Sequence, residues 1–169
     1  MTSRMRSSIC SGLPRRPTPV FFLLLAAPWL SSLAQTNGVL NIAPPERLTI
    51  KRGGTAELKL KAALQPGFHV NSNSPNDEFL IPLKLTWAKE PIEAEQVVFP
   101  KPQLEKYDFS QNPVSVFSGN FEIVTRFKAP VSARPGLVVM TGKLRYQACN
   151  NKECLQPRNL DLRFTADIQ

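Results

Sequence analysis

Histidine and cysteine are scarce in this chain of 169 residues. It contains one histidine, His69, and three cysteines. Structural zinc sites take four ligands from cysteine and histidine side chains. Cys149 and Cys154 together with His69 make only an incomplete set of this kind, so the sequence argues against a metal site.

Long hydrophobic runs are absent as well, which argues against a retained membrane anchor. A spanning helix needs about 20 apolar residues, whereas the apolar run from Val20 is about half that length and meets Pro28. Four arginines precede the run: Arg4, Arg6, Arg15 and Arg16. Small residues follow it up to Ala34, as signal peptidase requires. We therefore predict a cleavable signal peptide over residues 1–34, cut after Ala34, and a soluble exported domain over residues 35–169 without stable membrane insertion.

Blocks of like charge are the third absence. Cleavage after Ala34 would remove four of the 21 basic residues and none of the 13 acidic ones, which leaves a net charge of +4. The remaining basic side chains are scattered along the sequence, whereas nucleic-acid-binding proteins gather them into patches. A small excess of positive charge spread over the surface is explained by solubility alone. We therefore predict no nucleic-acid partner.

No window of the sequence has the apolar spacing of an amphipathic helix, and the 16 prolines of the chain oppose long helices. Apolar residues instead alternate with polar ones, as in strands with one buried face. The alternation is clearest in residues 56–62, 83–87, 121–128 and 159–168. Turn-forming groups of glycine, proline and asparagine separate these segments. About seven short strands joined by turns predict an all-β fold, an immunoglobulin-like antiparallel β-sandwich.

The two cysteines of the predicted domain lie at the end of one such strand. From Val138 the apolar positions alternate through Tyr146 and Ala148, which places Cys149 in the opposite, polar phase. We therefore expect Cys149 on the wetter face of the sheet, outside the core, and Tyr146 in the core. Residues 150–153 have the polar composition of a turn, so the two sulfur atoms should meet at one end of a hairpin.

Spacing leaves two interpretations of this cysteine pair open. In an exported protein the simpler one is a structural disulfide. The loop-entropy model, however, gives a ring of about six residues only about 2 kcal/mol of stabilisation, against about 5 kcal/mol for a ring of about a hundred. The other interpretation is a dithiol that cycles between reduced and oxidised forms, for which proximity matters more than loop length.

Five short motifs follow one another along residues 39–169. They are Gly67-Phe-His-Val-Asn-Ser-Asn73, Leu83-Lys-Leu-Thr-Trp87, Val98-Phe-Pro100, Val116-Phe-Ser-Gly119, and Tyr146-Gln-Ala-Cys149 with Cys154-Leu-Gln-Pro157. Their order and spacing resemble the N-terminal periplasmic domain of DsbD-type thiol:disulfide interchange proteins. The resemblance implies an immunoglobulin-like fold that relays electrons from a membrane reductase to periplasmic thioredoxin-like partners without a cofactor.

The resemblance also implies roles for individual residues. Cys154 is the nucleophile that forms a mixed disulfide with a partner, and Cys149 is the resolving thiol. The family shields its disulfide with an aromatic side chain on a cap loop, which residues 106–110 match. Phe109 is the first candidate for this cap and Tyr107 the second, with simple packing on the sandwich edge as the alternative.

Two further residues are expected near the same end of the sandwich. His69 lies in the first motif and either lines the site or serves as a hydrogen-bonding structural residue. Tyr146 is expected in the core first and in the site wall second. Full-length members of the family continue into a membrane domain and a thioredoxin-like domain, whereas this chain stops at Gln169. We therefore expect a separately encoded membrane thiol reductase as a partner.

Three hypotheses of function result. The first is a periplasmic thiol:disulfide exchange module of the protein-disulfide reductase type. The second is a non-catalytic immunoglobulin-like binding or scaffold domain with a structural disulfide. The third is a metal-handling domain that would use Cys149, Cys154 and either His69 or Met140.

Overall fold

The computed structural model describes residues 38–169, so the predicted signal peptide and its cleavage after Ala34 lie outside the described residues. All regular elements of the described chain are strands. They are β1 (Leu40–Ile42), β2 (Leu48–Ile50), β3 (Thr55–Leu64), β4 (His69–Asn71), β5 (Lys84–Trp87), β6 (Glu93–Val98), β7 (Gln103–Glu105), β8 (Val114–Ser118), β9 (Asn120–Lys128), β10 (Gly136–Tyr146), β11 (Ala148–Cys149) and β12 (Arg158–Ile168). Within this range no helix is long and apolar enough to cross a membrane.

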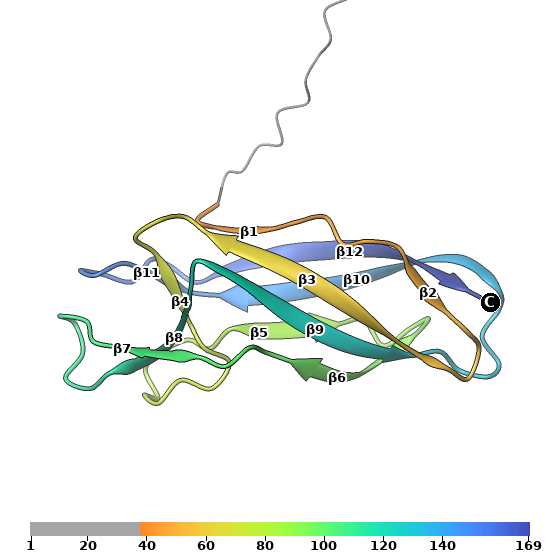
Figure 1. The fold of residues 1–169 in the computed structure, drawn as a ribbon, viewed down its shortest axis with the longest axis horizontal. Coiled ribbons are helices and arrows are strands. Elements are labelled where there is room, and N and C mark those ends of the chain that lie inside the picture. The colour runs from red at the N-terminus through yellow and green to blue at the C-terminus, as the bar shows by residue number, and fades with distance from the viewer. Residues whose placement is uncertain (1–37) are drawn as a thin grey trace, which may run out of the picture. The chain divides into compact units, whose positions relative to one another are not determined.

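Two four-stranded sheets form the body of the domain (Figure 1). One has the order β1-β3-β9-β6 and the other β2-β12-β10-β5. Their strand pairs are antiparallel except for β2, which runs parallel to β12. The predicted immunoglobulin-like β-sandwich is confirmed, with this one parallel pair at an edge.

The core lies between the two sheets and is centred on aromatic rings. Trp87 on β5 packs edge-on against Phe127 on β9 and Phe164 on β12, with ring centroids 5.4 Å apart in both pairs. Its indole N–H donates a hydrogen bond to the hydroxyl of Thr125, 3.0 Å away, so the buried polar group has a partner. Gly142 lies opposite Trp87 on β10, and a Cβ atom there would lie only 2.3 Å from the indole ring. A glycine at this position therefore makes room for the tryptophan.

A third, smaller sheet has the order β11-β4-β8-β7. Its inner face continues the core, because Ala148, Val70 and Phe117 belong to the main cluster of buried apolar residues. Successive residues of a strand point to opposite faces. The neighbours of these three residues, including Cys149 and His69, therefore project from the other face of the same strands.

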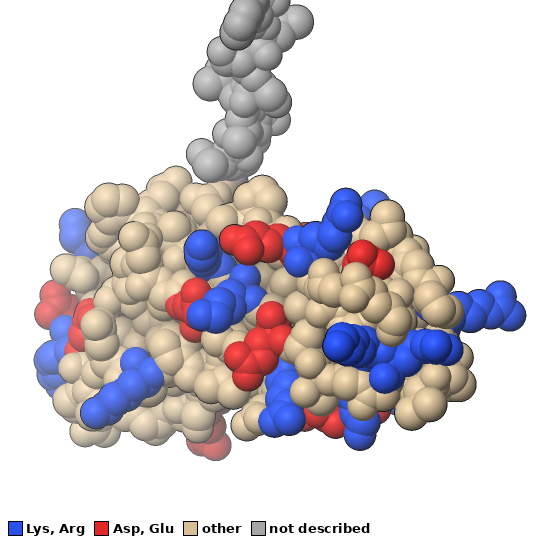
Figure 2. Space-filling model, turned by 45° about the vertical axis from the view of Figure 1, so that its right-hand side comes forward, with Lys and Arg blue, Asp and Glu red and all other residues tan. Residues whose placement is uncertain are grey.

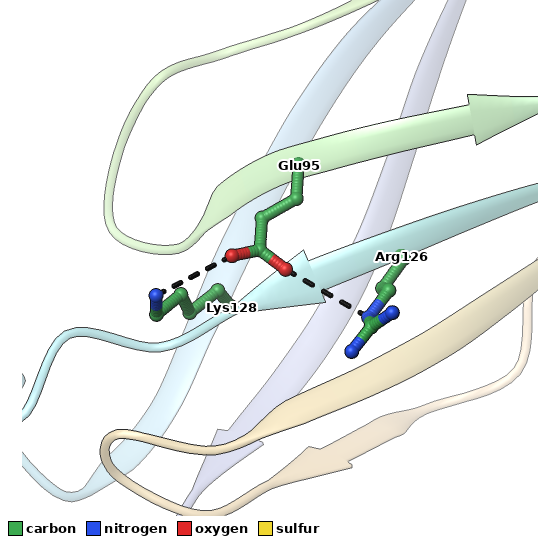
Figure 3. A network of polar contacts seen from close by, with 3 residues as sticks. All are labelled: Glu95, Arg126 and Lys128. Atoms are coloured by element: carbon green, nitrogen blue, oxygen red, sulfur yellow. Dashed lines mark ion pairs between the residues drawn. The ribbon is translucent and has the colours of Figure 1, made fainter.

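Charged side chains cover the outer surface of the sandwich without forming a large area of one sign. Basic and acidic residues are interspersed on the face drawn in Figure 2. Figure 3 shows Glu95 of β6 between Arg126 and Lys128 of β9, with N–O distances of 3.7 and 3.4 Å. Exposed ion pairs of this kind contribute at most about 1 kcal/mol each, so the core and not the surface holds the sheets together.

Candidate functional site

The two cysteines close a tight hairpin. Cys149 ends β11, and the chain returns to pair it with Cys154 as an isolated antiparallel bridge. The sulfur atoms form a disulfide with an S–S distance of 2.04 Å. The side-chain oxygen of Asn150 accepts hydrogen bonds from the backbone N–H groups of Lys152 (2.8 Å) and Glu153 (2.9 Å). Asparagine builds such turns because its short side chain can bond to nearby backbone groups. The structure thus contains the predicted hairpin and turn.

Four residues from three separate segments of the sequence form a row across the small sheet. Cys149 lies opposite His69 on β4, and His69 lies opposite Ser118 on β8. Cys154 continues the row on the other side of Cys149. Opposite residues of antiparallel strands point to the same face, with Cβ atoms about 4.5–5.5 Å apart. We call the surface defined by Cys154, Cys149, His69 and Ser118 the site face.

Cys149 lies on the side of the sheet that the sequence predicts, but the prediction that this position is wet is wrong. Cys149 is 0% exposed, whereas Cys154 is half-buried. β10 ends at Tyr146, and after Gln147 the chain leaves β12 and pairs with β4 instead. The alternation persists across this break, because Ala148 packs in the main apolar cluster while Cys149 pairs with His69 on the opposite face. Its burial shows that other segments cover the site face.

Aromatic rings from the loop between β7 and β8 provide cover on this face. Tyr107 stacks on His69 with ring centroids 4.0 Å apart, and Phe109 lies 5.3 Å from Tyr107 and 6.3 Å from His69. The three ring planes agree within 17°. Exposure increases outward, from 2% for His69 through 7% for Tyr107 to 36% for Phe109. Both cap candidates and His69 therefore lie together on the side of the sheet that carries Cys149.

The loop that carries these rings, residues 106–113, is held largely by its own short-range contacts. The backbone N–H of Ser110 bonds to the carbonyl of Tyr107 (3.2 Å), and the Ser110 hydroxyl donates to the carbonyl of Asn112 (2.8 Å). Tyr107 packs with Val114, Val116 and Leu80 in a small apolar cluster that is separate from the main core. The end of the loop is also tied to another segment, because the side-chain amide of Asn76 donates a 2.7 Å hydrogen bond to the carbonyl of Pro113.

Polar groups beneath the rings have unusual surroundings. The Tyr107 hydroxyl donates a hydrogen bond to Glu105, and burial together with this carboxylate raises the pKa of Tyr107. Burial lowers the pKa of His69, and the charge of Glu105 partly opposes that shift. Within residues 38–169, two buried side-chain atoms have no hydrogen-bond partner, His69 Nε2 and Asn71 Oδ1. An unsatisfied buried polar atom lowers the free energy of unfolding by about 1–3 kcal/mol. The two atoms therefore destabilise the fold on this face, which is expected of a functional site more than of a purely structural one.

Tyr146 is a core residue, as the sequence predicts. It is 2% exposed, belongs to the core cluster, and burial raises the pKa of its hydroxyl. It borders a cavity of about 180 Å³ together with Ala148 and Leu155. Tyr146 therefore lies behind the hairpin on the core side and not on the site face. A larger cavity of about 830 Å³ along β5, β10 and β12 contains none of the predicted site residues.

Sequence reasoning missed the polar residues that surround the histidine. Glu105 bonds to Tyr107, and its other carboxylate oxygen accepts a bond from the Ser118 hydroxyl at 3.3 Å. The same hydroxyl lies 2.7 Å from the side-chain oxygen of Gln103. A signal for Glu105 was present in its position two residues before Tyr107, since residues i and i+2 of an extended segment share a face. Nothing in the sequence linked Ser118 to His69, because that pairing depends on strand register.

The third hypothesis, a metal-handling domain, finds no preformed ligand cluster. Among the described residues no group of three histidine, cysteine, aspartate or glutamate side chains is placed to hold a metal ion. Both candidate cysteine ligands are joined in the disulfide. Met140, the alternative to His69 as third ligand, is fully buried in the core cluster.

Comparison with known families identifies the domain. The family model described as "Thiol:disulfide interchange protein DsbD, N-terminal" matches residues 41–165. This range includes the hairpin, the loop of residues 106–113 and all four residues of the site face.

Comparison with one solved structure supports the fold. The N-terminal periplasmic domain of ScsB from Proteus mirabilis is 14% identical with a TM-score of 0.50, and the match covers 74% of this chain and 44% of that one. This chain thus spans less than half of the ScsB structure. The seventh ScaB type I cohesin from Pseudobacteroides cellulosolvens is 12% identical with a TM-score of 0.43, covering 77% of this chain and 92% of the cohesin. No curated protein sequence matches the chain.

Proposed function

The chain belongs to the family of DsbD N-terminal domains, and from this premise we propose that it is a periplasmic thiol:disulfide exchange module. In this proposal the Cys149–Cys154 pair passes two electrons at a time to or from thioredoxin-like proteins. Residues 1–34 direct export, and a membrane thiol reductase on a separate chain supplies electrons in the reducing direction.

The unequal exposure of the two cysteines is the observation that carries this proposal. Cys154 is half-buried and Cys149 is fully buried, so an incoming protein can reach only one end of the bond. That asymmetry fits Cys154 as the attacking thiol and Cys149 as the resolving one. The bond closes a loop with a sequence separation of only 5, so it can open and close without unfolding the sandwich.

The reducing direction can be written as two balanced exchange steps. The Cys154 thiolate attacks one sulfur of the partner disulfide, which breaks that bond and releases the second partner sulfur as a thiolate. Cys149 then attacks the Cys154 sulfur in the mixed disulfide and releases the first partner sulfur. Two electrons have passed to the partner, which leaves as a dithiol, and Cys149 and Cys154 are joined again.

Phe109 and Tyr107 act as the cap in this proposal. In the closed arrangement they stack with His69 on the site face and limit access to the bond. A thioredoxin-like partner would displace the loop of residues 106–113, which requires the Tyr107–His69 stacking and the hydrogen bond from Asn76 to Pro113 to break. The cap then protects the pair from thiols that cannot make this displacement.

A trapping experiment tests the mechanism. Cys149→Ser leaves Cys154 without its resolving thiol, so the variant should accumulate mixed disulfides in periplasmic extracts, seen as bands that disappear on reduction. Cys154→Ser is the matched control and should give none, because the remaining thiol is buried. Equal trapping by the two variants, or trapping by neither, would contradict the assigned roles.

Full burial of Cys149 also favours a second candidate, a scaffold domain whose disulfide is structural. A redox titration with thiol alkylation separates the two functions. An exchange module should have a reduction potential of about −120 to −270 mV, whereas a structural bond should lie below about −300 mV.

A further inference from the structure

We propose that His69 accepts the proton of the Cys149 thiol when that thiol resolves the mixed disulfide. This inference rests on the exchange function proposed above and adds a proton acceptor to it. His69 is the single histidine of the chain, and an unperturbed imidazole titrates near neutral pH, where proton transfer is most useful.

The position of His69 supports this role. It lies directly opposite Cys149 in the β4–β11 pair, so both side chains project from the site face. Cross-strand neighbours of this kind have Cβ atoms about 4.5–5.5 Å apart, so the two side chains are adjacent on that face. Cys154, whose sulfur atom the Cys149 sulfur must attack, lies on the other side of Cys149 from His69.

The hydrogen bonding of His69 provides an independent observation. Its ring is 2% exposed, and its Nε2 atom has no hydrogen-bond partner among the described residues. A histidine with a structural role would be expected to satisfy both nitrogens in such a buried place. In the oxidised protein the neighbouring sulfur carries no proton. In the reduced protein Cys149 gains one, and a free imidazole nitrogen can accept it.

The proposed step balances. The imidazole takes the proton from the Cys149 sulfur as that sulfur attacks Cys154, a new Cys149–Cys154 bond forms, and the bond from Cys154 to the partner breaks. The partner sulfur leaves with the electron pair of the broken bond, and the imidazolium or water returns a proton to it. In the opposite direction the imidazolium protonates Cys149 as it leaves.

The charges around His69 suit a neutral base that can become an imidazolium. Glu105 of β7 favours the charged form, while burial under Tyr107 of the loop disfavours it. Ser118 of β8 adds a hydroxyl and no charge, and β11 contributes Cys149 itself. Opening of the loop would expose the imidazole of His69 to solvent and leave its attraction to the Glu105 carboxylate. The pKa of His69 would then rise, so its imidazole would be a stronger base when a partner is engaged.

A chromophoric small disulfide, dithiobis(nitrobenzoate), tests the step without a natural partner. Attack by Cys154 releases a first coloured thiolate, and attack by Cys149 on the resulting mixed disulfide releases a second. The rate of the second phase measures the resolving step alone. We compare the reduced wild type with His69→Phe, which keeps a ring against Tyr107, and His69→Gln, which keeps polarity without a basic nitrogen.

Both variants should slow the second phase about 100-fold near neutral pH and leave the first phase within about twofold. The ratio of wild-type to variant rates should approach one above about pH 9, where a cysteine thiol loses its proton unaided. A ratio that stays constant with pH, or equal rates near neutral pH, would overturn the role of His69. If the wild type shows no second phase at any pH, the exchange function itself fails.

A titration of the single imidazole by nuclear magnetic resonance decides the inference even in that case. The pKa of His69 should differ between the oxidised and reduced wild type, because only the reduced state places a thiol opposite the ring. Identical pKa values in both redox states would show that the ring does not sense the thiol. Because the chain has one histidine, the signals need no assignment.

Discussion

The two faces of the β11-β4-β8-β7 sheet are built from alternating residues of the same strands, yet they differ in kind. On the inner face, Val70 and Phe117 join the main core and are 0% and 3% exposed. On the site face, Cys149 and His69 are equally buried but lie outside that core. Equal burial therefore has two different sources in one sheet.

The source of burial determines what each face can do. The inner face is covered by the main core, where Phe117 stacks with Phe121 of β9 at a centroid distance of 5.2 Å. On the site face, Tyr107 and Phe109 of the loop of residues 106–113 stack with His69, and Asn76 holds the end of that loop through the carbonyl of Pro113. Unsatisfied polar atoms occur at His69 and Asn71 on this second face. Such departures from ideal packing are expected where function competes with stability.

Phe117→Ala on the inner face should have the largest effect. Removal of a buried phenylalanine side chain from a core costs about 3–5 kcal/mol in the free energy of unfolding. Urea denaturation measures this loss. The potential of the disulfide should hardly change in variants that remain folded, and a large change would show that the two faces are not independent.

Removal of the disulfide should have an intermediate effect. The double variant Cys149→Ser with Cys154→Ser should lose only about 2 kcal/mol, because the loop that the bond closes is short. The free energy of unfolding of this double variant is measured in urea and compared with that of the oxidised wild type. A loss as large as that of Phe117→Ala would favour the scaffold function.

Phe109→Ala should change reactivity more than stability. The stacked contact of Phe109 with Tyr107 is worth about 0.5–1.5 kcal/mol, and the ring is already 36% exposed. The rate of disulfide reduction by dithiothreitol should rise, because the cap is incomplete. Leu104→Ala, at an exposed position of β7, is the control and should leave the rate unchanged.

The pH dependence of stability should show the smallest effect. Burial lowers the pKa of His69, so the unfolded chain binds a proton more readily than the folded one at and below about pH 6.5. The stability that His69 contributes is thus present above this pH and lost as the pH falls. Between about pH 8 and about pH 5 the wild type should lose more unfolding free energy than His69→Phe. Parallel curves for the two proteins would contradict the direction of this pKa shift.

Much of the fold was accessible from the sequence. Alternation in residues 56–62 and 159–168 predicted β3 and β12, and the phase from Val138 predicted the side of the sheet on which Cys149 lies. The candidate site was accessible only in part. Both cysteines, His69, Tyr107 and Phe109 could be named, but the solvent exposure of Cys149 was predicted wrongly.

Alternation is a local property, because each residue of a strand points away from its neighbour whatever surrounds it. The sequence alone therefore determined the longer strands, their buried sides and the closeness of two sulfur atoms five positions apart. It predicted about seven strands, whereas the described residues form twelve. Only the tertiary structure decided that His69 and Ser118 continue the row of cysteines, because register joins segments that no sequence spacing relates. The tertiary structure also decided that Cys149 is shielded from solvent, because burial depends on which other segments of the chain pack against that face.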